Sequence, residues 1–195
     1  MTVRTAFVGI TGASGAPYTV RLVEALTQLE VEVEICASEM GEKVLAYELG
    51  GMSSKGLAER YGARRYAPDD LFAPPASGTS VPDATVIAPA SVSTLARIAT
   101  GAGTNLLHRV ADVALKERRR LVLLEREMPY SRIHLENMLT VTEAGGIVIS
   151  AAPGFYNHPQ SVEDLVDFVV GKVLDAMGIE HDVTERWGHK RRERR

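Results

Sequence analysis

Short apolar runs alternate along this chain with longer segments whose apolar residues recur at helical spacing. The apolar runs predict buried strands at residues 5–11, 31–37, 84–90, 121–124 and 146–150. The amphipathic segments predict helices at 17–29, 38–49, 54–61, 91–100, 106–118, from Ser131 onward, and from Ser161 through Val173. Because strands and helices alternate, the pattern favours one α/β domain with an open parallel sheet covered by helices on both faces.

The first predicted strand runs directly into a turn of small residues. The stretch reads FVGITGASGA, and it places Gly12, Ala13 and Ser14 between a buried strand and a helix. This geometry presents backbone N–H groups to an anion at a helix N-terminus. It matches neither the dinucleotide fingerprint nor the P-loop, so phosphate binding and simple tight packing both remain open at this turn.

Polar residues also follow the other predicted strands. These residues are Ser38, Ser91, Ser93, Thr94, Arg126, Glu127 and Tyr156. Since parallel strands present their carboxyl ends at one edge of a sheet, we expect a single polar site there with an anionic ligand.

For three further charged residues, the sequence pattern alone gives less indication of a role. Glu48 lies near the end of a predicted helix, where its charge opposes the helix dipole, although it could equally be a solvated side chain. Arg109 and Lys116 are seven residues apart in one predicted helix and therefore lie roughly on one face of it.

Composition narrows the class of protein. The chain has 195 residues, 45% of them hydrophobic and 24% charged, which suits one soluble globular domain. The formal net charge of −3 does not favour nucleic acid, and neither a signal peptide nor a membrane-length apolar run is evident. A single cysteine, Cys36, suits a reducing cytoplasm, where we expect the protein to act. No spacing of metal ligands is recognisable, and residues 189–195 form a basic tail that we expect to be disordered.

Taken together, the motifs resemble the flavin prenyltransferases, or UbiX-like family. The matching segments span nearly the whole chain: GITGASGA, PPASG, PASVSTLARIATG, NLLHRVADVALKERR, LVLLEREMPYSRIHLENML, AAPGFY and SVEDLVDFVVGKVLDAMGI. The resemblance implies one Rossmann-like or flavodoxin-like domain over residues 1–188. It also implies trimers that build a dodecamer, with the active site between subunits.

The implied reaction moves a dimethylallyl group from dimethylallyl phosphate to N5 and C6 of reduced FMN, without a metal. The product would serve a separate UbiD-like decarboxylase as its cofactor. Carried over by motif, the FMN-binding residues are Gly12, Ala13, Ser14, Ser38, Ser91, Val92, Ser93, Thr94 and Arg126. The resemblance assigns binding of the prenyl phosphate to Tyr156 and Lys172, with Arg109 and Lys116 nearby. Glu48 and Glu127 correspond to the acidic residues of the active site, and Trp187 to a residue that covers it. Glu127 is the candidate for proton handling.

The chain departs from the family pattern at residues 90–93, where many relatives carry Cys-Ser or Gly, and at two single positions. Leu71 stands where some members have Trp, and Lys172 stands where others have Arg, which keeps the charge but loses the bidentate fork. Two other functions remain as alternatives: a flavin-dependent cysteine decarboxylase and an FMN-binding protein without catalysis. The absence of any histidine before His108 argues against the decarboxylase, which depends on an early histidine.

Overall fold

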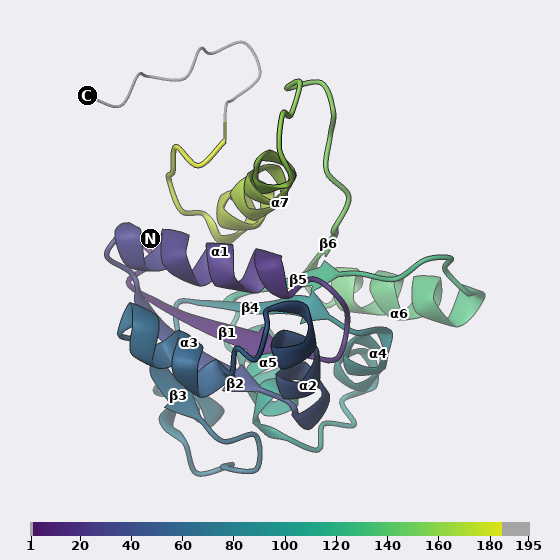
Figure 1. The fold of residues 1–195 in the computed structure, drawn as a ribbon. Helices are drawn as coiled ribbons and strands as arrows, with labels where there is room; N and C mark the ends of the chain where they lie inside the picture. Colours follow the sequence, from purple (N-terminus) through teal and green to yellow (C-terminus); the bar gives the residue numbers. More distant parts are fainter. Residues whose placement is uncertain (1, 185–195) are drawn as a thin grey trace.

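A computed structural model describes residues 2–184 of the chain. Its elements, in chain order, are β1 (Thr5–Ile10), α1 (Ala16–Gln28), β2 (Glu32–Ala37), α2 (Glu39–Glu48), α3 (Ser54–Tyr61), β3 (Arg64–Tyr66), the 3-10 turn η1 (Pro74–Ala76), β4 (Ala84–Ala90), α4 (Val92–Thr100), α5 (Leu106–Lys116), β5 (Arg120–Glu125), α6 (Arg132–Glu143), β6 (Ile147–Ser150) and α7 (Val162–Met177). Figure 1 shows how the helices surround the sheet.

The strands form one six-stranded sheet in the order β3-β2-β1-β4-β5-β6, and every neighbouring pair is parallel. After β3 the chain crosses back over β1 to begin β4, so the strand order reverses between β1 and β4. Open α/β sheets bind ligands outside the carboxyl ends of their strands at such a reversal. The topology therefore directs attention to the turns that follow β1 and β4.

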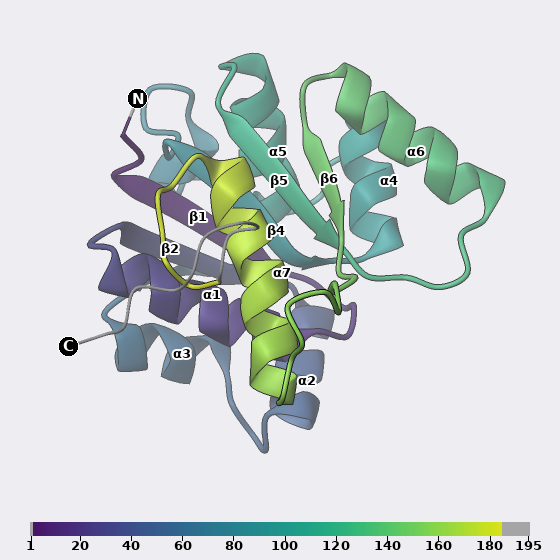
Figure 2. The same cartoon turned by 90° about the horizontal axis from the view of Figure 1, so that it is seen from above.

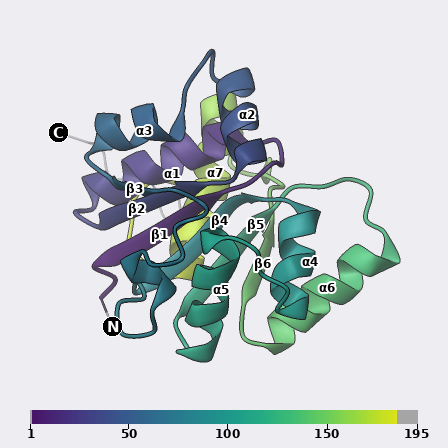
Figure 3. The ribbon, with the colours of Figure 1, turned by 90° about the horizontal axis from the view of Figure 1, so that it is seen from below.

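Each face of the sheet is covered by its own helices. Helices α1, α3 and α7 bury one core against alternate strand residues such as Val8, Ile35 and Val86. Helices α4, α5 and α6 cover the opposite face, where Ile87, Leu121 and Leu123 point. Figure 2 shows α1 and α7 in front of the strands, and Figure 3 shows α4, α5 and α6 on the other side. This arrangement explains why the strands read as apolar runs rather than as alternating ones.

The helix starts follow local sequence rules. Serine side chains accept from a backbone N–H of the first turn at Ser38, Ser53, Ser91, Ser131 and Ser161. Ser161 forms a capping box with Asp164, and Ser131 forms a second one with His134. His134 therefore has a structural role in fixing the start of α6.

The α/β class, the parallel sheet and its two helical layers are confirmed, and the strand and helix positions agree within a few residues. One strand, β3, is absent from the sequence-based prediction. It has only three residues, reads Arg-Arg-Tyr, and pairs with β2 at the edge of the sheet, so no apolar run marks it. The domain end at residue 188 and the basic tail lie outside the described residues and stay predictions. No helix in the described part of the chain combines the length and apolar composition that crossing a membrane requires.

Candidate functional site

The turn after β1 is shaped by two glycines with different tasks. Gly15 is the N-cap of α1 and has φ of 130°, a conformation that glycine adopts without strain. Gly12 lies against α2, and a Cβ there would come within 2.7 Å of the Met40 Cβ. Ala13 is buried while Ser14 is exposed. The turn thus leaves Ser14 at the surface of the carboxyl edge, with α2 packed beside it.

Glu48 is not a solvated side chain. Its Oε2 accepts hydrogen bonds from the backbone N–H groups of Gly15 at 3.0 Å and Ala16 at 2.8 Å. Burial alone would raise the pKa of Glu48, but hydrogen bonds from Ser14, Gly15 and Ala16 and the nearby Arg126 charge hold that pKa below its usual range. The carboxylate therefore opposes the dipole of its own helix and complements that of α1.

A buried threonine links the two turns at the strand reversal. The Thr11 hydroxyl donates to the carbonyl of Pro89 at 2.6 Å and accepts from the amide of Ser91 at 2.8 Å. This pair of bonds fixes the start of α4 beside the end of β1. Thr11 is absent from the expected site residues, although its position directly after a strand could have signalled it.

The start of α4 has the donor chemistry that an FMN phosphate needs. Ser91 caps the helix and accepts from the Thr94 amide at 3.3 Å. Its hydroxyl also lies 3.1 Å from that of Thr94, and Ser93 is exposed. First-turn amides, including that of Val92, have no partner within the helix and attract anions. The residues at this end therefore fit a phosphate group.

Ser38 lies at the same edge on the other side of β1. Its backbone N–H donates to Ile10 at 2.9 Å, and its side chain caps α2 by accepting from Gly41. Ser38 is half-buried, and its hydroxyl oxygen already accepts the Gly41 hydrogen bond, so a ligand would have to share this hydroxyl with the Gly41 amide.

Arg126 and Glu127 follow β5 as predicted. The Arg126 Nε donates to the Ser14 carbonyl at 3.3 Å, which ties the end of β5 to the turn after β1. Glu127 is half-buried, and its Oε1 accepts from the Met128 amide at 3.0 Å. The carboxyl edge thus joins a cation and an acid from β5 to the acid of α2 at the start of α1.

The last residue of β5 is a buried acid that the sequence analysis passed over. Glu125 is completely inaccessible, and its Oε2 accepts from the Tyr130 hydroxyl at 2.6 Å. Burial raises the pKa of Glu125, and the hydrogen bond from Tyr130 and the charges of His134 and Arg126 offset only part of that rise. A charged residue at the end of an otherwise apolar strand was the available signal.

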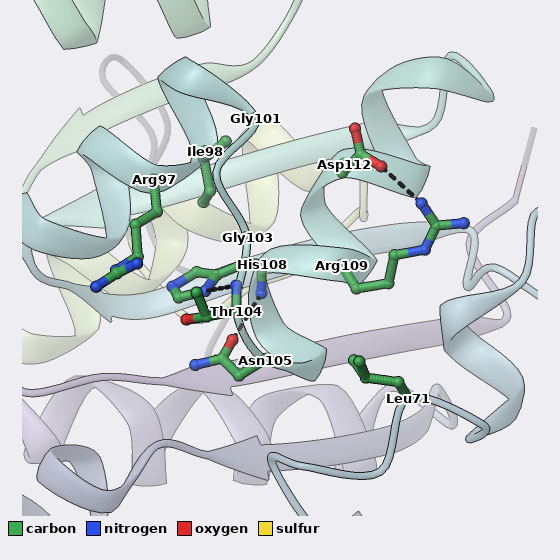
Figure 4. A pocket seen from close by; sticks show the side chains of 10 residues that line it. All are labelled: Leu71, Arg97, Ile98, Gly101, Gly103, Thr104, Asn105, His108, Arg109 and Asp112. Atoms are coloured by element: carbon green, nitrogen blue, oxygen red, sulfur yellow. Dashed lines mark hydrogen bonds and ion pairs between the residues drawn. The ribbon is translucent and has the colours of Figure 1, made fainter.

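Arg109 lies in a separate pocket. Its Nε donates to Ala76 at 3.1 Å and its Nη1 to Asp112 at 2.8 Å. The pocket encloses about 300 Å³ between the end of α4 and the start of α5, with Leu71, Arg97 and His108 also on its wall (Figure 4). Burial lowers the pKa of His108, and the charge of Arg97 acts in the same direction. No hydrogen bond or ion pair in the described chain joins Arg109 to Glu48, Arg126 or Glu127.

Lys116 lies at the opposite edge of the sheet from Arg126. It ends α5, just before β5 begins, and it pairs with Glu117. The six residues of β5 then span ~20 Å before Arg126 is reached. Arg109 and Lys116 are both exposed on α5, where their seven-residue spacing puts them on roughly one face, but one chain does not bring Lys116 to the carboxyl edge.

Tyr156 and Lys172 belong to the loop before α7 and to α7 itself. The Tyr156 ring packs edge-on against Phe168 at 5.6 Å, one helical turn before Lys172. Lys172 is exposed and lies 4.0 Å from Asp175. Trp187 lies outside the described residues. Tyr156 follows the end of β6 by six residues, so it is further from the strand end than the other predicted residues.

Within residues 2–184, no group of three or more His, Cys, Asp and Glu side chains is arranged to hold a metal ion. What the carboxyl edge offers is a helix start for a phosphate, an arginine that reaches the first turn, and two acids of different environment. This set suits anion binding and proton transfer at one place.

The chain as a whole is similar to known flavoproteins. The Flavoprotein family model matches residues 2–174. A flavin prenyltransferase UbiX of Pseudomonas aeruginosa is 50% identical over 193 residues, with 93% of this chain and 92% of that protein covered. The crystal structure of AnUbiX in complex with FMN and dimethylallyl pyrophosphate matches with a TM-score of 0.92 at 38% identity, over 96% of this chain and 99% of that one. A dodecameric FMN-dependent UbiX-like decarboxylase from Escherichia coli O157:H7 matches with a TM-score of 0.88 at 41% identity, over 95% and 100% of the two chains.

Proposed function

This chain belongs to the Flavoprotein family and within it to the flavin prenyltransferases, and on that premise we propose that it prenylates reduced FMN. The donor is dimethylallyl phosphate, whose allylic C–O bond breaks as phosphate leaves. The carbon released from phosphate bonds to the flavin N5, which loses its proton. The prenyl C=C double bond then takes up a proton at one carbon while its other carbon bonds to C6, which loses its proton in turn. The observation that carries the proposal is the meeting of Ser14, Glu48 and Arg126 beside the hydroxyl-rich start of α4.

FMN binding is assigned first. The phosphate belongs at the start of α4, where Ser91, Ser93 and Thr94 supply hydroxyls and Val92 a first-turn amide. Gly12, Ala13, Ser14 and Ser38 line the approach from β1 and β2, and Arg126 supplies a charge-assisted hydrogen bond to the flavin. Bound in this way, FMN supplies the nucleophilic positions of the reaction.

Two acids then differ in what they can do with a proton. Glu48 already accepts from two backbone amides and has a lowered pKa, which keeps it ionised as an electrostatic partner of the site. Glu127 is half-buried, and within residues 2–184 its carboxylate accepts one hydrogen bond, from the Met128 amide. We therefore assign to Glu127 the removal of protons from the flavin.

The leaving phosphate needs cations, and we assign this role to Arg109, Lys116, Tyr156 and Lys172 in an assembled protein. In one chain Lys116 and Arg126 are separated by the length of β5. A site shared between subunits would bring them together, and the dodecamer named for the E. coli relative is the assembly we propose. Large apolar side chains are exposed at Phe72, Met128 and Ile133, which is typical of surfaces covered by another copy.

The direct test is to mix the protein anaerobically with reduced FMN and dimethylallyl phosphate and to measure the mass of the flavin. The proposed function predicts a gain of one C5 prenyl unit with release of inorganic phosphate. Unchanged FMN would leave a flavin carrier as the explanation. Decarboxylation of a cysteine peptide under oxidising conditions would instead support the cysteine decarboxylase, which the 42–50% identity to flavin prenyltransferases does not favour.

The shared site has its own test. Lys116→Ala and Glu127→Gln should each be inactive alone, but mixed oligomers should regain part of the wild-type rate because some sites combine two intact residues. Mixed oligomers that stay inactive would show that both residues serve the same site from one chain. We also propose a cytoplasmic location, supported by the free thiol of Cys36, and a UbiD-like decarboxylase as the consumer of the product.

A further inference from the structure

The Glu125 carboxyl group is the most deeply buried acid near the proposed site. Its side chain is 0% exposed, and its Oε1 is a buried oxygen without a hydrogen-bond partner. Alternation along β5 directs Glu125 to the same face as Leu121 and Leu123, toward α4 and α6. Burial of an unpaired polar atom is costly, so this position demands an explanation.

The one partner that the carboxyl group has is informative. Tyr130 donates its hydroxyl to Glu125 Oε2 at 2.6 Å, and the same hydroxyl lies 3.5 Å from Ser150 at the end of β6. Glu125 and Tyr130 enclose residues 126–129, which include Arg126 and Glu127. The hydrogen bond therefore closes a short loop whose two ends are fixed to the sheet.

Burial disfavours the charged form of Glu125 and raises its pKa, although the hydrogen bond from Tyr130 acts in the opposite direction. Glu127 lies close enough to disfavour a second negative charge, while Arg126 and His134 act in the opposite direction, and burial outweighs them. Burial and the hydrogen bond also raise the pKa of Tyr130, so the hydroxyl keeps its proton.

We propose that Glu125 and Tyr130 are positioning residues for prenyl transfer, because their hydrogen bond sets the conformation of residues 126–129 and so aims Arg126 and Glu127 at the ligand. The proposal rests on the function proposed above. Arg126 reaches Ser14 from this loop, so a change in loop conformation would act on flavin binding as well as on proton transfer. Neither Glu125 nor Tyr130 needs to touch the ligand.

The test compares four proteins: the wild type, Glu125→Leu, Tyr130→Phe and the double variant. Tyr130→Phe leaves the buried Glu125 carboxyl group without its partner, whereas the double variant removes that group, so its unfolding temperature should return from the Tyr130→Phe value toward the wild-type value. Turnover should fall about 10- to 100-fold in Glu125→Leu and stay low in the double variant, because the loop has lost its tie. FMN affinity should weaken in parallel through Arg126.

Two further variants keep the test decisive. Glu125→Gln retains an acceptor for Tyr130, and its turnover should stay within about threefold of the wild type. Tyr66→Phe removes a similar tyrosine–glutamate bond, from Tyr66 to Glu34 at 3.0 Å, at the other end of the sheet order. It should lower stability without changing turnover.

Recovery of turnover together with stability in the double variant would overturn the proposal, since the pair would then be merely structural. So would wild-type turnover and FMN affinity in Glu125→Leu. If the wild type itself makes no prenylated flavin, the proposed function fails, but the FMN affinities of the same variants still decide whether the pair positions Arg126.

Discussion

Helices α1 and α4 both begin at the carboxyl edge of the sheet, one on each side of the strand reversal, yet their first amides meet different partners. The start of α1 receives the Glu48 carboxylate from α2, at 2.8 and 3.0 Å. The start of α4 is capped by its own Ser91 and carries further hydroxyls. The two helix starts therefore differ in their anion: at α1 the fold supplies the Glu48 carboxylate, whereas at α4 the first-turn amides and hydroxyls are left for the phosphate that we propose to bind there.

The two acids of the site, Glu127 after β5 and Glu48 at the start of α1, give the sharpest prediction. Glu127→Gln should lower the single-turnover rate about 10²- to 10⁴-fold while FMN still binds, because the amide cannot accept a proton. Glu48→Gln should have a smaller effect on that rate, since Glu48 is already engaged by α1. The measurement is anaerobic single-turnover absorbance with product mass, and Glu143→Gln at the exposed end of α6 is the control. A larger loss of single-turnover rate in Glu48→Gln than in Glu127→Gln would indicate that Glu48, at the start of α1, removes the protons.

The phosphate assignment predicts the next effect. Ser93→Asp should weaken FMN binding by up to ~10³-fold, as expected for two like charges about 4 Å apart at an effective dielectric constant of about 20. Ser93→Asn has nearly the same shape without the charge and serves as the control. Ser14→Asp should weaken binding less, because its new charge lies beside Glu48 rather than at the phosphate. FMN affinity is measured by fluorescence titration. Equal losses of affinity in Ser93→Asp and Ser14→Asp would place the phosphate between the starts of α1 and α4.

The smallest effect concerns stability and pH. Glu48 has a lowered pKa in the folded protein, so between that value and its ordinary pKa the unfolded chain binds more protons. Its contribution is present above the ordinary pKa and is lost as pH falls through the lowered one. Glu48→Gln should therefore reduce the free energy of unfolding at pH 7 by about 0.3–1 kcal/mol, and the difference should shrink toward pH 3.5. Urea unfolding at both pH values measures this, and a constant difference would exclude the charge as its cause.

Local signals carried much of the prediction. Serine caps at Ser38, Ser91, Ser131 and Ser161 follow from a few neighbouring residues, and the structure has all four. The apolar runs likewise predicted the strands, except for polar β3 at the sheet edge. The family followed from motifs spread over the whole chain, and the comparisons confirmed it.

The sequence by itself determined the helices and every strand except β3, the strand ends that carry polar residues, and the family, because each of these is set by residues close together in the chain or by their order. Only the tertiary structure decided that Glu48 crosses to α1, whose amides lie 32 and 33 positions away in sequence. It likewise decided that Glu125 is buried with Tyr130 and that Lys116 lies a strand length from Arg126. These facts depend on which elements pack together, and the free energy of that packing is shared among many distant side chains rather than encoded at any one of these positions.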